Sequence, residues 1–157
     1  MILLAFVLTV IVTDWRWRRI PNVVTYPTIV AGLGLSALAG LGGLGGEGLI
    51  DHVAAVVLAF LVCYPFYAAG GLKAGDAKLL MSVAALRVTG FFLGAAFYGA
   101  MLGGVVALGF IVVRKLSKPG PGDPPNTLRR ILGMWIPYGV ALGGGVLVAL
   151  AVDLTRA

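Results

Sequence analysis

Apolar positions along this chain form long runs that are separated by short stretches rich in charge, glycine or proline. The runs predict six helices: five at about residues 1–19, 22–41, 49–69, 91–113 and 130–152, and a brief fourth one that starts at 76 or 77 and is followed by Arg87 and Gly90. A glycine-rich turn at 41–48 and a proline-rich loop at 117–126 fall between them. The series of helical runs predicts an all-α fold.

The lengths of the runs suit a membrane, because a helix needs about 20 residues to cross one. Only 13 residues precede Asp14, so the first helix is expected to continue through Trp17 at the interface and to end before Pro21. The fourth helix is expected to begin at Asp76 or Ala77 and to be short. The pattern therefore predicts a polytopic membrane protein with about six transmembrane helices.

Composition supports this interpretation. Of the 157 residues, 60% are hydrophobic and 11% are charged, and the mean hydropathy is +1.02. A soluble domain of this length carries roughly 25% charged residues. One small globule cannot bury so much apolar surface, so lipid is expected to cover the rest. We therefore interpret residues 1–157 as a single integral membrane domain.

Cysteine and histidine usage argues against a metal or cofactor site. The single cysteine, Cys63, lies in an apolar run and can form neither an internal disulfide nor a cysteine-rich zinc site. Glu47, Asp51 and His52 lie close together in the sequence, and a solvated loop is the favoured interpretation of that cluster. We expect no cofactor and no metal.

The net charge of +6 could indicate nucleic-acid binding, but the distribution of the basic residues indicates membrane topology instead. Ten of the twelve fall in the loops after the first and fifth helices and before or at the start of the fourth: Arg16, Arg18, Arg19, Lys73, Lys78, Arg114, Lys115, Lys118, Arg129 and Arg130. Only Arg87 and Arg156 lie on the other side. The positive-inside rule then places the ten in the cytoplasm and both termini outside. No nucleic-acid partner is expected.

Two aspartates share the predicted cytoplasmic face. Asp14 lies near the end of the first helix, where the helix dipole and partial burial should raise its pKa. Asp76 opens the fourth helix as a possible N-cap, where the dipole should lower its pKa. Structural explanations stay open for both, namely an ion pair of Asp14 with Arg18 and a plain cap at Asp76. Taken together, carboxylates with separated pKa values suit acid–base chemistry.

The residues around these aspartates resemble a known family. Asp-x-Arg-x-x-Arg-Ile-Pro-Asn at 14–22 and Gly-Asp-x-Lys at 75–78 are similar to the two signature segments of type IV prepilin peptidases, which are membrane aspartyl proteases of the Gly-x-Gly-Asp class. A Pro-Tyr-Gly segment at 137–139 resembles a third. The resemblance implies that Asp14 and Asp76 are the catalytic pair. It implies supporting roles for Arg19, Pro21, Asn22, Gly75, Lys78, Pro137, Tyr138 and Gly139.

The resemblance also implies a substrate and a location. The substrate would be a prepilin or pseudopilin whose basic leader stays in the cytoplasm and is cut near the membrane boundary. The enzyme would be a multi-pass protein of the bacterial cytoplasmic membrane, with lipid around it and its active site facing the cytoplasm. The opposite helix-dipole environments of the two aspartates suggest their roles: Asp76, as a carboxylate, would activate a water molecule, and protonated Asp14 would donate to the scissile carbonyl oxygen.

The sequence departs from the family pattern in two respects. Lys73 stands where the first glycine of Gly-x-Gly-Asp is usual. The N-terminal methyltransferase segment of longer members, with its paired Cys-x-x-Cys, is not found in these 157 residues. The chain therefore resembles the short, peptidase-only members that are associated with Tad/Flp pili.

Two rival functions belong to other classes. A small transporter or channel would also place aspartates in membrane helices, although its acids are expected near the midplane rather than at one edge. A non-catalytic membrane scaffold would use the same aspartates only as caps or ion-pair partners.

Overall fold

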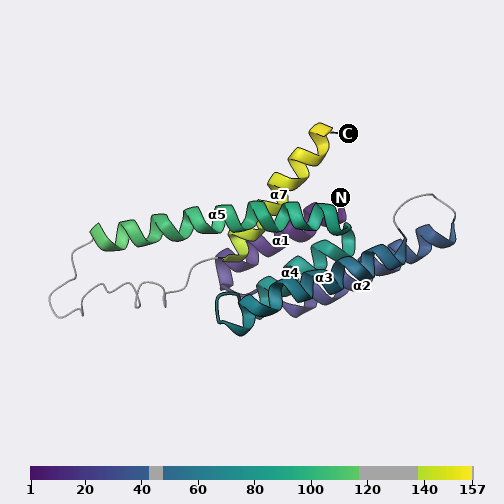
Figure 1. The fold of residues 1–157 in the computed structure, drawn as a ribbon, viewed down its shortest axis with the longest axis horizontal. Helices are drawn as coiled ribbons and strands as arrows, with labels where there is room; N and C mark the ends of the chain where they lie inside the picture. Colours follow the sequence, from purple (N-terminus) through teal and green to yellow (C-terminus); the bar gives the residue numbers. More distant parts are fainter. Residues whose placement is uncertain (43–47, 117–137, 157) are drawn as a thin grey trace.

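The structure is a computed structural model that describes residues 1–42, 48–116 and 138–156. Every regular element in this part of the chain is a helix (Figure 1). The helices are α1 (Ile2–Trp17), α2 (Asn22–Leu41), α3 (Leu49–Ala68), α4 (Ala74–Leu86), α5 (Thr89–Leu116) and α7 (Tyr138–Arg156). The predicted all-α fold is confirmed for the described residues.

The helix ends differ from the expected ones where a local backbone interaction decides them. Helix α1 ends at Trp17, because Arg18 adopts a left-handed conformation with φ of 55° and donates its N–H to the Asp14 carbonyl. Helix α4 begins at Ala74, two or three residues earlier than expected, because Lys73 occupies the N-cap position. Residues 130–137 of the last predicted helix and the proline-rich loop at 117–126 lie outside the described residues.

Four of the described helices are long and apolar enough to cross a membrane. They are α2, α3, residues 89–113 of α5, and α7, with 20, 20, 25 and 19 residues. Little of α2, α3 and α5 is buried inside the protein, as expected for helices that face lipid, whereas α7 is buried to a larger extent. Helices α1 and α4, with 16 and 13 residues, are shorter than a span of about 20. The chain therefore has the helices of a membrane protein, while the predicted six spans and outward termini stay predictions.

Helix α4 lies in the middle of the molecule. It packs along α2 and α3 on one side and also contacts α1, α5 and α7, while α5 and α7 form the other extensive helix pair (Figure 1). Because seven of its thirteen residues are buried, α4 is a core helix despite its charged first turn.

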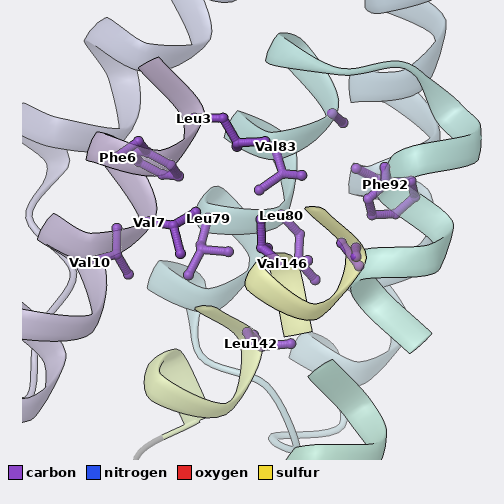
Figure 2. Packing of buried hydrophobic residues seen from close by; sticks show 14 of the residues in the cluster. Leu3, Phe6, Val7, Val10, Leu79, Leu80, Val83, Phe92, Leu142 and Val146 are labelled. Carbon is purple, nitrogen blue, oxygen red and sulfur yellow. The ribbon is translucent and has the colours of Figure 1, made fainter. Parts of the chain in front are cut away.

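One hydrophobic core joins the helices that carry the two aspartates. Val7 of α1, Leu79 and Val83 of α4 and Val146 of α7 are almost fully buried in it (Figure 2). Phe92 of α5 is fully buried in the same cluster. Burial of such side chains is worth about 1.5–3 kcal/mol each. This packing holds α1, α4 and α7 together and so determines where their polar ends lie.

Glycines allow the closest of these helix contacts. A Cβ atom on Gly32 of α2 would collide with the backbone carbonyl of Ala85 in α4. A Cβ atom on Gly145 of α7 would collide with the backbone of Gly99 in α5. Small residues at such positions let membrane helices pack closely.

Candidate active site

Asp14 lies three residues before the end of α1 and points toward the first described turn of α7. Its side chain is 5% exposed, and its Oδ2 atom accepts a hydrogen bond from the backbone N–H of Val140 at 3.2 Å. A Cβ atom on Gly139 would lie 2.7 Å from the same oxygen and 2.8 Å from the carboxylate carbon. Residue 139 must therefore be glycine for α7 to approach Asp14 this closely.

Asp76 is the third residue of α4, not its N-cap. Its carboxylate turns back and accepts the backbone N–H of Lys73 at 3.2 Å, as the N3 residue of a capping box does. The residue is 4% exposed. The first turn of α4 thus fixes the orientation of Asp76 through the backbone of the residue that precedes the helix.

Both aspartates line one cavity of about 530 Å³ between the α1–α2 connection and the start of α4. The other lining residues come from the same two segments: Trp17, Arg18, Arg19, Ile20, Pro21, Asn22, Lys73 and Gly75. The structure therefore brings Asp14, Asp76, Arg19, Pro21, Asn22 and Gly75 together, although 61 residues separate the aspartates in the chain.

Direct contacts join the two sequence segments. The Lys78 ammonium group donates to the side-chain oxygen of Asn22 at 2.9 Å, and it lies 4.8 Å from the centre of the Tyr26 ring. A Cβ atom on Gly75 would lie 3.3 Å from the Cβ of Ile20, so glycine lets α4 begin against the α1–α2 connection. These contacts give Lys78, Asn22 and Gly75 a role in assembling the cavity.

Of the Pro-Tyr-Gly segment at 137–139, the structure describes the tyrosine and the glycine, and these two residues lie differently relative to the cavity. Gly139 contacts Asp14 directly, as described above. The ring of Tyr138 packs toward Gly103 of α5, about 3.7 Å from where a Cβ atom would stand, and the residue does not line the cavity. Pro137 lies outside the described residues.

The cluster near residue 50 serves local structure in the described part. Asp51 accepts the backbone N–H of Gly48 at 2.9 Å and so caps the start of α3. The Nδ1 atom of His52 lies 2.9 Å from the carbonyl oxygen of Ala85, which ties α3 to the end of α4. Glu47 lies outside the described residues.

Burial controls the electrostatics of the two aspartates, both of which lie outside the four candidate spans. The pKa of Asp76 is raised to about 6, mainly by burial and also by the charge of Asp14, while the Lys73 N–H and ammonium group oppose the shift. Burial also raises the pKa of Asp14, against the N–H groups of Val140 and Gly139 and the charge of Lys73. The prediction of a raised pKa at Asp14 is confirmed. The prediction of a lowered pKa at Asp76 is wrong, because desolvation outweighs the helix dipole.

Such a pair can perform acid–base chemistry. Two buried carboxylates whose charges interact titrate as a unit, and one proton is shared between them over an intermediate pH range. One group can then accept a proton from water while the other donates one.

Sequence reasoning missed three contributors to this site. They are the Lys73 charge, the Val140 N–H and the Ile20 surface under Gly75. The proximity of Lys73 to Asp76 in the sequence was a usable signal for the first, whereas the Val140 contact joins residues 126 positions apart.

Comparison with known proteins points to one family. Residues 1–113, which include both aspartates, match the type IV leader peptidase family. The match ends before α7, so the Gly139 and Val140 contacts lie beyond it. No curated protein and no solved structure matches the chain significantly. Because the match covers well over half of the sequence, the chain belongs to the type IV leader peptidase family.

Proposed function

We propose that this protein is a membrane-embedded aspartic endopeptidase that removes the basic leader from prepilin-like substrates, with Asp14 and Asp76 as the catalytic pair. Membership of a leader peptidase family supports a peptidase acting on prepilin-type chains. The observation that carries the assignment of the pair is the shared cavity: the only two buried carboxylates among the described residues both line it.

Asp14 is the better candidate for the general base. Its carboxylate accepts the Val140 N–H, and hydrogen bonds of this kind stabilise the charged form. Asp76 has a pKa of about 6 and is the better candidate for the group that holds the shared proton. These roles are the reverse of those that the helix dipoles alone suggested.

The reaction needs one water molecule and no covalent intermediate. Asp14 takes a proton from water as the oxygen attacks the scissile carbonyl carbon, and Asp76 gives its proton to the carbonyl oxygen. The tetrahedral intermediate then collapses, with the C–N bond breaking, the leaving nitrogen taking the proton from Asp14 and Asp76 recovering its own. The pair is thereby restored for the next cycle.

The surroundings of the cavity support a cytoplasmic active site. Arg18, Arg19 and Lys73 line it, and these residues belong to the basic set that the positive-inside rule assigns to the cytoplasm. A leader that stays in the cytoplasm would meet the enzyme at this edge, just before its apolar segment enters the membrane. We place the protein in the bacterial cytoplasmic membrane, with the short peptidases of Tad/Flp pili as the nearest functional type.

Cleavage of a prepilin by the purified protein tests this function. The protein in detergent or liposomes is incubated with a prepilin that has a basic leader, and product masses and N-termini are determined. We expect one cut before the apolar segment by the wild type and none by Asp14→Asn or Asp76→Asn.

Asp153→Asn supplies the matched control, because it makes the same change at a carboxylate that pairs with Arg87 away from the cavity. It should cleave like the wild type. An intact substrate with folded wild-type protein would reject the proposed function, and flux across the same liposomes would favour the transporter.

A further inference from the structure

We propose that Lys73 is a positioning residue that acts through the two aspartates and sets the pH range in which the pair is active. This inference rests on the proposed peptidase function. Lys73 occupies the position where related signature segments carry glycine, so the proposal concerns a property in which this chain departs from them.

The geometry places the Lys73 backbone and side chain in different relations to the site. The backbone N–H donates to the Asp76 carboxylate at 3.2 Å, and any residue except proline could supply that bond. The side chain is exposed and lines the same cavity as both aspartates. Changes to the side chain therefore test its charge while the capping hydrogen bond stays in place.

The charge of Lys73 acts on both members of the pair. It favours the ionised form of Asp14 and of Asp76, opposing the burial that raises the pKa of each group. Both carboxylates are buried, so solvent screens the interaction less than it would at an open surface. A cation at this position moves the interval in which one proton is shared toward lower pH.

The other charged or titratable groups near the pair come from several elements. Among the described residues they are Arg18 and Arg19 in the α1–α2 connection, Lys78 on α4 and the Cys63 thiol on α3. The Lys78 ammonium group donates a hydrogen bond to the side chain of Asn22. Helix α7 presents backbone N–H groups to Asp14. The charge of Lys73 lowers the pKa of both aspartates.

The pH profile of cleavage is the direct readout. Prepilin cleavage by the wild type, Lys73→Met, Lys73→Gly and Lys73→Arg is measured across pH in detergent of low ionic strength. Loss of the cation should move both limbs of the bell-shaped profile to higher pH. On the acidic limb, the rate should fall about tenfold for every pH unit of displacement. Lys73→Arg should restore the wild-type profile.

Arg156→Met is the control. It removes one exposed cation at the C-terminal end of α7, outside the cavity and outside the signature segments, and should leave the profile in place. High salt should move the wild type toward Lys73→Met and should leave Lys73→Met itself almost unchanged.

Each outcome decides between the two claims. Superimposed profiles for the wild type and Lys73→Met, with the wild type active, would overturn the role of Lys73 and leave the peptidase standing. A displacement shared by Lys73→Arg would also overturn it, because the charge is then irrelevant. Absence of cleavage by the wild type would reject the proposed function itself.

Discussion

The position of the Asp14 side chain depends on a glycine of α7, a helix that is far from Asp14 in the sequence but in contact with it. A Cβ atom at position 139 would lie within 3.1 Å of three atoms of Asp14, so glycine there leaves room for the carboxylate. The backbone N–H of the neighbouring Val140 donates a hydrogen bond to that carboxylate. Two adjacent backbone units of α7 therefore fix the orientation of a side chain on α1. The same contact lowers the pKa of Asp14 against the effect of burial.

Gly139→Ala should reduce turnover without unfolding the protein. The new methyl group displaces the Asp14 carboxylate, and a misplacement of about 1 Å costs roughly 100-fold in rate. For prepilin cleavage, kcat should therefore fall by a much larger factor than KM changes. Gly104→Ala on α5 faces open space and should cleave normally. Equal rates for both variants would show that the contact does not position Asp14.

Asp76→Asn should make the protein inactive and more stable at neutral pH. The pKa of Asp76 rises on folding from its ordinary 3.8 to about 6, so folding favours the protonated form. Stability is therefore lost as pH rises between these values and stays lowered above about 6, by about 3 kcal/mol.

The neutral amide removes that loss. Thermal unfolding in detergent at pH 7.5 should show a higher Tm for Asp76→Asn than for the wild type, and the difference should shrink at pH 4. A Tm difference that is independent of pH would contradict the assignment of a raised pKa.

At the scale of helices, the sequence predicted which helices exist better than it predicted where they begin and end. Helix α2 has the predicted bounds, since Pro21 and the glycine-rich turn mark both of its ends. The start of α4 was misplaced, because a lysine N-cap uses only backbone groups and leaves no preferred residue type to recognise. Spacing along one helix could not reveal that Asp76 is buried, because the helices that pack around α4 come together only in the folded molecule.

Helices α2 and α4 approach so closely that a single methyl group should separate them. Gly32→Ala would place its Cβ against the Ala85 carbonyl, which is backbone and cannot rotate away. We expect the free energy of unfolding to fall by about 1–3 kcal/mol. Gly34→Ala on the same helix meets open space and should be neutral or slightly stabilising, since alanine favours helix.

Thermal unfolding of the two purified variants compares them directly. Matching Tm values for Gly32→Ala and Gly34→Ala would show that the α2–α4 contact tolerates the extra atom. It would also remove the packing argument for glycine at position 32.

At the scale of the whole molecule, the two candidate catalytic residues could be predicted from the sequence, but their burial and their shared cavity could not. The two segments around Asp14 and Asp76 identified the aspartates, and the basic loops assigned both to one membrane face. Their burial and their shared cavity depend on the core that joins α1, α4 and α7. No local pattern contains that information, because the contacts join residues far apart in the chain.

The predicted topology can be measured with single cysteines in a Cys63→Ala background. Arg16→Cys reports the end that carries the cavity, and Leu154→Cys reports the C-terminal end of α7; both positions are exposed. A membrane-impermeant maleimide added to intact spheroplasts should label position 154 at once. Position 16 should react only after permeabilisation. The opposite labelling order would reverse the orientation and place the cavity outside.

The central claim is that Asp14 and Asp76 act as one unit. Cleavage rates of a prepilin by Asp14→Asn, Asp76→Asn and the double variant, measured by mass spectrometry with folded protein, test it most directly. Residues that act as a unit are not additive, so each single variant should be as inactive as the double. A single variant that cleaves at the wild-type rate would contradict the account.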